Sequence, residues 1–198
     1  MNPLYPVFFK LDKLQLLIVG AGVVGHEKLS FMLKSSPNAN ITVIADWISP
    51  AVEALAKQYP LQLNFIKKLF EPTDVVGFNL IVAATNIPTV NKAVHHAAKA
   101  AGILVNVADT PDLCDFYLGA IVTKGNLKIA ISTNGKSPTF AKRLRQLLEN
   151  SLSDDVNTTL ELLQEFRNRL GTDCDEKVRK LNALTETLLS EKDDAQFN

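Results

Sequence analysis

Three glycines whose spacing suits phosphate binding stand near the start of the chain. Gly20, Gly22 and Gly25 follow an apolar run and precede a helical pattern. Gly20 allows a tight turn, Gly22 lets the backbone approach a phosphate, and Gly25 permits close packing of a helix on a strand. Glycines also gather at ordinary turns, but the strand before and the helix after are the context that phosphate binding requires. The segment therefore predicts a cradle for the pyrophosphate of a dinucleotide.

The first helical residues and the end of the second apolar run extend this prediction. The N–H groups of Val23 and Val24 lie at the positive end of the helix dipole and favour an anion. Asp46 stands 21 positions after Gly25, at the end of "ITVIAD", where a carboxylate holds ribose hydroxyls. Trp47, and not an arginine suited to a 2′-phosphate, follows it, so the pattern favours NAD over NADP. Trp47 either stacks on the adenine or packs on the next helix.

Polar residues also end the fourth and fifth apolar runs. Thr85 ends the fourth run, and Asn106 and Asp109 lie in the last part of the fifth. Ligands of open α/β sheets bind at the carboxyl ends of the strands. We therefore expect Thr85 to contact the cofactor and Asn106 the substrate. Asp109 can take or give a proton while a hydride moves, and the alternative is that it caps the turn "DTPD".

The segment "STNGKSPTF" (132–140) repeats the strand–turn–helix arrangement on a smaller scale. Asn134-Gly135 turns the chain, and Ser137-Pro138 begins a helix. Ser137 is a helix N-cap, an anion-binding hydroxyl for the substrate, or both. Lys136 beside it adds a positive charge for an acidic ligand.

The order of the apolar runs predicts the elements that position these residues. Strands are expected at 14–19, 41–46, 61–66, 79–85 and 103–109, with helices at 23–34, 50–59 and 90–102 between them. Strands alternating with helices favour an α/β fold, a Rossmann-like doubly wound parallel sheet.

After Asp109 the pattern changes. Two apolar segments flank Thr123-Lys124-Gly125, which predicts a β-hairpin with a positive φ at the glycine. Helical patterns with apolar faces follow, the first including Phe140, Leu144, Leu147 and Leu148. We expect three domains: a dinucleotide-binding domain at 1–113, a hairpin, dimerisation and substrate-carboxylate region at 114–150, and a helical domain at 151–198.

Composition bounds the class of protein. The chain has 198 residues, 46% of them hydrophobic, which is enough for a buried core. No long apolar run or signal-peptide pattern is present, so the cytoplasm is the expected compartment and no membrane partner is expected. Cys114 and Cys174 are expected to be reduced and structural. No set of His, Cys and Asp residues has the spacing of a metal cage, so no metal ligand is predicted.

The formal net charge of zero hides an asymmetry. Residues 1–150 carry 15 Lys+Arg and 10 Asp+Glu, whereas residues 151–198 carry 6 and 11. The segment 116–148 has no acidic residue and contains Lys124, Lys128, Lys136, Lys142, Arg143 and Arg145. Such a segment is a solvated basic face or attracts an acidic small molecule. It lacks the interleaved aromatic residues that favour nucleic acid, so no nucleic-acid partner is expected.

The segments 5–29, 79–91 and 105–149 together resemble the precorrin-2 dehydrogenase family, of the siroheme synthase N-terminal type. The most diagnostic pair is "NVADTPDLCDF" (106–116) followed by "STNGKSP" (132–138). The resemblance implies NAD-dependent oxidation of precorrin-2 to sirohydrochlorin on the way to siroheme. In that family the aspartate of the first motif is the acid/base group, which here is Asp109, and the serine of the second lies at the substrate pocket, which here is Ser137.

The resemblance also implies partners. Precorrin-2 carries eight carboxylates, so the basic segment 116–148 gains a role in holding the macrocycle. The helices after residue 150 are expected to complete a homodimer and to roof the cleft. Some relatives also insert ferrous iron, which makes a bifunctional dehydrogenase and ferrochelatase an alternative function. A non-catalytic NAD-sensing module is the alternative from another class.

Overall fold

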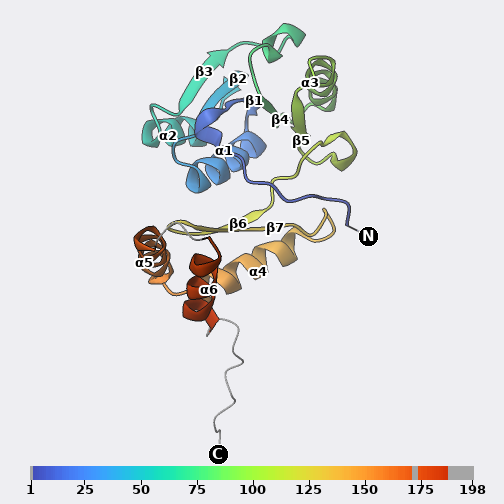
Figure 1. Cartoon of the computed structure of the whole chain (residues 1–198). Helices are drawn as coiled ribbons and strands as arrows, with labels where there is room; N and C mark the ends of the chain where they lie inside the picture. Colours follow the sequence, from blue (N-terminus) through green and yellow to red (C-terminus); the bar gives the residue numbers. More distant parts are fainter. Residues whose placement is uncertain (1, 171–173, 187–198) are drawn as a thin grey trace, which may run out of the picture. The chain divides into compact units, whose positions relative to one another are not determined.

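The computed structural model describes residues 2–170 and 174–186. The chain forms two units (Figure 1). The first comprises Met1–Ile121 with Ala130–Lys142, and the second comprises Val122–Ile129 with Arg143–Asn198. Within the described residues, none of the helices combines the length and the apolar character needed to span a bilayer.

A five-stranded parallel sheet forms the centre of the first unit. Its strands lie in the order β3-β2-β1-β4-β5, with β1 at Gln15–Ala21, β2 at Asn40–Ile48, β3 at Leu63–Lys67, β4 at Leu80–Ala83 and β5 at Leu104–Val107. The order reverses between β1 and β4, so that the chain winds outward in both directions from these central strands. The prediction of a doubly wound, Rossmann-like parallel sheet is confirmed. In such sheets ligands bind at the carboxyl ends of the strands beside this reversal.

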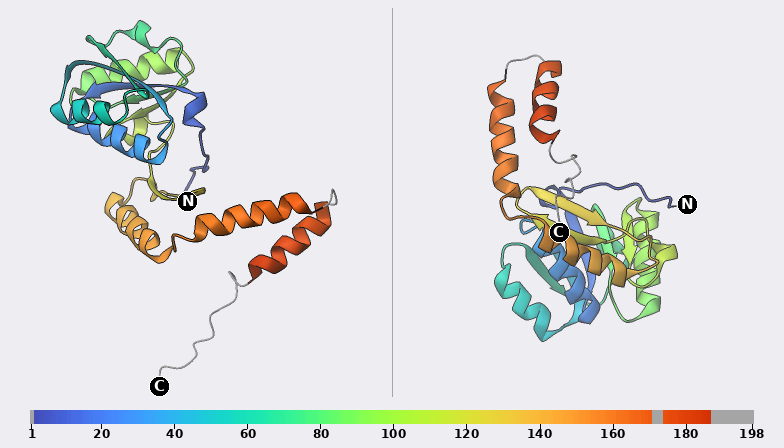
Figure 2. Two further views of the ribbon diagram at one scale, coloured as in Figure 1. Left: turned by 90° about the vertical axis from the view of Figure 1, so that its left-hand side faces the viewer. Right: turned by 90° about the horizontal axis from the view of Figure 1, so that it is seen from below.

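Helices cover both faces of the sheet (Figures 1 and 2). Alternate residues of β1 serve the two faces, because successive side chains of a strand point in opposite directions. Leu16 and Ile18 pack with helices α1 (Val23–Ser35) and α2 (Pro50–Gln58). Leu17 and Val19 pack with α3 (Pro88–Ala100) and with the 3-10 turn Pro72–Val75. Burial on both faces explains why the central strands are continuous apolar runs.

The strand β2 is longer than expected because its end leaves the sheet and returns. Val19 of β1 pairs with Ile44, and Ala21, only two residues later, pairs with Ile48. One residue of β1, Gly20, therefore faces three of β2. Ala45 stays buried and pairs with Lys67 of β3, whereas Asp46 and Trp47 are exposed and form the outward bulge. The N–H of buried Ser49 then donates to the carbonyl oxygen of Ala21 (3.1 Å). Ser49 also accepts the N–H of Val52 and begins α2, as an N-cap serine does.

The outer edge of β5 is covered by the segment that follows it. The N–H of Val105 donates to the carboxylate of Asp115 (3.1 Å), and the Asp115 N–H donates to the Val105 carbonyl oxygen (2.8 Å). Lys99 of α3 donates to the same carboxylate (2.7 Å). These bonds satisfy edge groups that would otherwise be left open for another strand.

The predicted hairpin is confirmed, with its turn at Gly125-Asn126 and not at Thr123-Lys124-Gly125. Strands β6 (Ala120–Lys124) and β7 (Leu127–Ile131) pair, and Gly125 in the turn has a φ of 56°. In the second unit the hairpin tip contacts α5 (Val156–Arg169), where Asn157 accepts the N–H of Asn126 (2.8 Å). A Cβ on Gly125 would collide with the Asn157 side chain.

The helices after the hairpin carry apolar side chains that this chain leaves uncovered. These helices are α4 (Pro138–Ser151), α5 and α6 (Cys174–Thr185). The apolar face predicted for α4 is only partly buried, because Phe140 and Leu147 are 59% and 60% exposed. On α5, Leu162 and Phe166 are exposed as well. Cys174 begins α6, and its predicted structural role falls on a side chain outside the described part of the structure.

We predict that Asp115→Asn lowers the free energy of unfolding by about 1–2 kcal/mol at neutral pH, the value of a charge-assisted hydrogen bond. Burial by itself raises the pKa of Asp115, but the hydrogen bonds from Lys99 and from the Val105 N–H outweigh it, so the pKa lies below its ordinary value. A lowered pKa means that the stabilisation is complete above the ordinary aspartate pKa of about 4 and is lost as the pH falls through the folded-state value.

Urea unfolding of the wild-type protein and Asp115→Asn at neutral and acidic pH measures this effect. The difference between the two proteins should shrink as the pH falls below about 4, the pKa of an unperturbed aspartate. Asp112→Asn, at an exposed position in the same segment, is the matched control. A difference that did not change with pH would contradict the assignment to the carboxylate.

Candidate dinucleotide and substrate site

The glycine turn is a place where three backbone segments approach one another too closely for side chains. A Cβ on Gly25 would lie 2.2 Å from the carbonyl oxygen of Gly20, because the start of α1 packs directly on the end of β1. A Cβ on Gly20, whose φ is 109°, would lie 2.6 Å from the carbonyl oxygen of Ala84 at the end of β4. The first and third glycines therefore have the structural roles that the motif predicted.

Gly22 has a different environment, because nothing lies within 4 Å of where its Cβ would be. It is the N-cap of α1, with no side-chain cap, and no acidic residue occupies the first turn. The first-turn amides, including those of Val23 and Val24, are therefore not satisfied by a side chain, and Val23 itself is 86% exposed. A helix N-terminus with open space beside uncapped amides binds anions such as a diphosphate.

The predicted ribose-side residues lie in the outward bulge of β2, opposite the glycine turn. Asp46 and Trp47 are two of the three residues that face Gly20 across the register shift. Both are exposed, and Trp47 leaves 60% of its surface open. This exposure argues against the interpretation that the indole packs on α2, and it leaves the carboxylate and the indole available to a ligand.

Thr85 lies at the end of β4, against the same turn, and is held by a residue that sequence reasoning missed. The side-chain amide of buried Asn91, on α3, bonds the N–H, the carbonyl oxygen and the hydroxyl of Thr85. The Thr85 hydroxyl also accepts the N–H of Ile87 (3.1 Å). The spacing of Thr85 and Asn91 across a strand-to-helix loop was the one signal that could have indicated this pair.

Asp109 occupies a strained turn at the end of β5, next to the end of β4. The N–H of Ala108 donates to the carbonyl oxygen of Ala83 (2.9 Å), which places the two strand ends side by side. Asp109 has a φ of 56°, a left-handed conformation that few non-glycine residues adopt, and its side chain is exposed. The turn closes through the N–H of Thr110, which donates to Val107, and not through the carboxylate of Asp109. The carboxylate is therefore presented outward from a fixed backbone.

Cys114 holds this turn in place. Its Sγ accepts the N–H of Val107 (3.2 Å), and its proton can be donated to the carbonyl oxygen of Val107 (3.2 Å) or of Thr110 (3.4 Å). The thiol thus bridges both ends of the loop that carries Asp109. The structural role expected for Cys114 is present here, and the sequence offered no sign of which loop it would serve.

Asn106 is buried within the fold, 6% exposed, and its amide nitrogen donates to the carbonyl oxygen of Phe116 (2.8 Å). In this structure the side chain ties the segment after the Asp109 turn back to β5. Direct contact with a substrate stays a prediction for Asn106.

Ser137 caps α4, since its hydroxyl accepts the N–H of Phe140 (3.2 Å). The predicted chain reversal at Asn134-Gly135 precedes it, and both residues have a left-handed backbone (φ 53° and 74°). Lys136 is exposed beside it. The structure does not bring Lys136 or Ser137 into hydrogen-bond contact with Asp109, so their shared role in one site stays a prediction.

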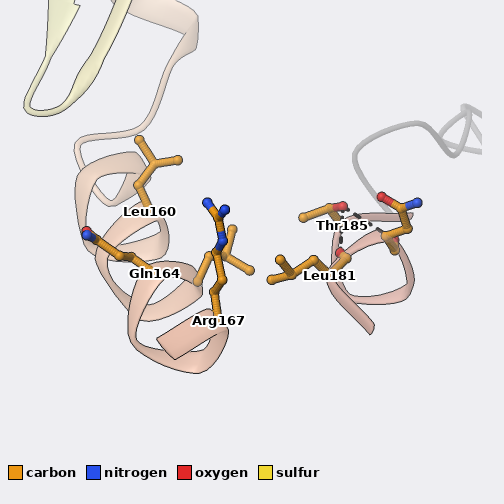
Figure 3. Close-up of a pocket in the computed structure, with 7 residues that line it drawn as sticks. Leu160, Gln164, Arg167, Leu181 and Thr185 are labelled. Carbon is orange, nitrogen blue, oxygen red and sulfur yellow. Dashed lines mark hydrogen bonds between the residues drawn. The ribbon is translucent and has the colours of Figure 1, made fainter. Parts of the chain in front are cut away.

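A separate hollow of about 420 Å³ lies between α5 and α6 in the second unit (Figure 3). Its lining, within the described part of the chain, combines three leucines with three uncharged polar residues and one arginine. These residues are Leu160, Leu163, Gln164, Arg167, Leu181, Asn182 and Thr185. The Thr185 hydroxyl bonds back to its own helix at the carbonyl oxygens of Leu181 and Asn182.

The doubly wound sheet, with uncapped amides beside open space at the glycine turn, defines a dinucleotide-binding protein. Residues 7–120 match the family described as "Putative NAD(P)-binding", and residues 124–151 match the family described as "Sirohaem biosynthesis protein central". The first match covers more than half of the chain, which therefore belongs to that NAD(P)-binding family.

Curated relatives include siroheme synthases. That of Methylococcus capsulatus is 41% identical over 165 residues, 83% of this chain and 34% of the relative. That of Psychrobacter cryohalolentis is 39% identical over 163 residues, 82% of this chain and 30% of the relative. The chain thus spans about a third of the length of these proteins. Among solved structures, SirC, a precorrin-2 dehydrogenase, is similar at a TM-score of 0.75 with 27% identity, covering 91% of this chain and 89% of that one.

We predict that Gly22→Ala and Gly25→Ala fail in different ways. Gly22→Ala has room in the folded chain, so its melting temperature should stay near that of the wild type, while the methyl group weakens NAD binding by at least about tenfold. Gly25→Ala must displace the backbone of Gly20 and should lower the free energy of unfolding by about 1–3 kcal/mol, the cost of overpacking. Thermal unfolding and NAD titration, followed by the fluorescence of Trp47, the single tryptophan, measure both. Normal NAD binding by Gly22→Ala would contradict the cradle.

We predict that Cys114 reacts slowly with iodoacetamide in the folded protein. Burial raises the pKa of its thiol, and the hydrogen bond with the Val107 backbone lowers it by less. A raised pKa leaves a smaller thiolate fraction at mildly alkaline pH, and the thiolate is the nucleophile. Mass spectrometry of the peptide that contains Cys114, with and without urea, measures the rate. Equal rates in the two conditions would show that the thiol does not hold the turn.

Proposed function

We propose that this chain catalyses the NAD-dependent oxidation of precorrin-2 to sirohydrochlorin in siroheme biosynthesis. The observation that carries the proposal is the likeness to SirC over nearly the full length of both chains. The siroheme synthase relatives and the match of residues 124–151 to a sirohaem biosynthesis family support the same pathway. The uncapped amides of the glycine turn supply a place for the cofactor.

In this proposal, different residues of the first unit bind the cofactor and accept the proton. NAD, when bound, supplies the acceptor for a hydride. The amides after Gly22 would hold its diphosphate, and the carboxylate of Asp46 would bond the ribose hydroxyls and repel the 2′-phosphate of NADP. The exposed carboxylate of Asp109 would accept the proton that leaves the macrocycle as the hydride departs. Its strained backbone fits a residue held for function, since such strain gathers at active sites.

The substrate carboxylates need cations and hydrogen-bond donors. Lys136 is exposed beside the N-terminus of α4, and the segment 116–148 has no acidic residue to compete with a polyacid. Charge-assisted hydrogen bonds to carboxylates are stronger than neutral ones. We therefore propose Lys136, Ser137 and Asn106 as substrate-side residues.

The assembly and the division into domains belong to the same proposal. The exposed apolar side chains of α4 and α5, among them Phe140, Leu147, Leu162 and Phe166, suit a homodimer interface. Residues 1–113 would then bind the cofactor, and residues 114–150 would serve both dimerisation and the substrate carboxylates. Residues 151–198 would form a helical domain that completes the dimer. The cytoplasm is the proposed location, and ferrous iron is a proposed additional substrate.

The test is turnover of precorrin-2 by the purified chain with NAD. Without added iron, sirohydrochlorin and NADH should form in equal amounts. In a second assay with ferrous iron, the chain should accelerate formation of the iron adduct only if it also acts as a chelatase. If the chain binds NAD but does not turn over precorrin-2, the proposed dehydrogenase activity is contradicted. The alternative function of a non-catalytic NAD-sensing module would then be favoured.

We predict that Asp109→Asn lowers kcat by at least about 100-fold, the usual share of general acid–base catalysis. Asparagine matches the size of aspartate and tolerates the left-handed φ of position 109, so the turn should keep its shape. The dissociation constant for NAD should change little. Asp112→Asn, three residues later and exposed, is the control and should keep full activity. Equal losses in both variants would remove Asp109 from the chemistry.

A further inference from the structure

One buried side-chain amide holds the loop between β4 and α3. Asn91, 7% exposed, accepts the N–H of Thr85 (3.2 Å) and the Thr85 hydroxyl (2.7 Å) at its Oδ1. Its Nδ2 donates to the carbonyl oxygen of Thr85 (3.0 Å). The amide therefore binds Thr85 through its donor and its acceptor at once, as a neighbouring strand would.

The peptide held in this way is the one that meets the glycine turn. A Cβ on Gly20 would lie 2.6 Å from the carbonyl oxygen of Ala84 and 2.9 Å from the nitrogen of Thr85. The link from Ala84 to Thr85 is thus pressed against Gly20 on one side and clamped by Asn91 on the other. A shift of this peptide changes the space beside the turn.

The hydrogen bonds around Thr85 have one consistent arrangement of protons. The Thr85 hydroxyl donates to Asn91, because Asn91 offers the shorter distance, 2.7 Å against 3.2 Å to the carbonyl oxygen of Ile87. The hydroxyl oxygen is then free to accept the N–H of Ile87 (3.1 Å). Thr85 therefore has no hydroxyl proton left for a ligand, and its contribution depends on where Asn91 holds it.

We propose that Asn91 is a positioning residue for the dinucleotide, which clamps the Thr85 peptide against Gly20 and so fixes the wall of the cofactor site opposite α1. This inference rests on the proposed function only in that NAD is the ligand. Asn91 itself touches no cofactor in this arrangement and acts through Thr85.

The test compares variants at position 91 with a control on the same helix. Asn91→Asp keeps the acceptor but sets a carboxylate oxygen against the Thr85 carbonyl oxygen, and Asn91→Ser removes the clamp without adding charge. Each should raise the dissociation constant for NAD by about tenfold, as expected for a lost buried hydrogen bond. Val94→Ala leaves a cavity on the buried face of α3, where Val94 is fully buried. It should lower the melting temperature but leave the NAD affinity unchanged.

The pH dependence separates positioning from general destabilisation. A buried carboxyl has a raised pKa, so Asn91→Asp should protonate at mildly acidic pH and regain a donor toward the Thr85 carbonyl oxygen. The ratio of its NAD dissociation constant to that of the wild type should then fall toward one. Neither Asn91→Ser nor Val94→Ala should show this recovery. If Asn91→Ser and Val94→Ala lost NAD affinity in proportion to their losses of melting temperature, the proposal would be overturned.

Amide hydrogen exchange gives a readout that needs no cofactor. The amides of Thr85 and Ile87 should exchange faster in Asn91→Ser than in Val94→Ala, because only the first variant releases the loop. Unchanged exchange at these amides would overturn the inference even where the wild type binds NAD. Failure of the wild type to bind NAD, with the exchange difference present, would count against the proposed function and not against the clamp.

Discussion

The close contact of the end of β1 with the start of α1 and the end of β4 is the constraint on which the rest of the site depends. At Gly20 and Gly25 the backbones approach to distances that exclude a Cβ. Because these three segments touch without side chains between them, the first amides of α1 face the carboxyl edge of the sheet. At Gly22 the same turn leaves open space. A single stretch of six residues therefore combines the densest packing in the site with its room for a ligand.

The loops around this contact share a second principle, since each is held by one side chain from a neighbouring segment. Asn91 holds the loop at Thr85, Cys114 bridges the turn that carries Asp109, and Asp115 covers the edge of β5. Each holding side chain is hydrogen-bonded to the loop or strand that it serves, whereas Asp46 and Asp109 have exposed side chains that face solvent. Such a division keeps the reactive side chains in fixed positions without using their own hydrogen-bonding groups, as preorganised sites require.

In the second unit, several exposed side chains are apolar, unlike the carboxylates of Asp46 and Asp109 that are exposed at the site. Asn157 of α5 secures the hairpin tip, but α5 also exposes Leu162 and Phe166. Exposed apolar side chains on a helix favour association with another surface. Acidic residues outnumber basic ones in residues 151–198, whereas basic residues outnumber acidic ones in residues 1–150. The two parts of the chain therefore carry net charges of opposite sign.

The sequence by itself determined the order of strands and helices, the glycine turn, the cap at Ser137 and the chain reversal at Asn134-Gly135. These features follow from local rules, namely periodicity, backbone freedom at glycine and short-range capping, so neighbouring residues suffice to read them. Only the tertiary structure decided four other features of the site. These are the clamp by Asn91, the bridge by Cys114, the hydrogen bond from buried Asn106 to Phe116 and the outward bulge at Asp46. Each of these features depends on which segments lie side by side in the folded chain. The local rules used to interpret a single sequence do not give that proximity.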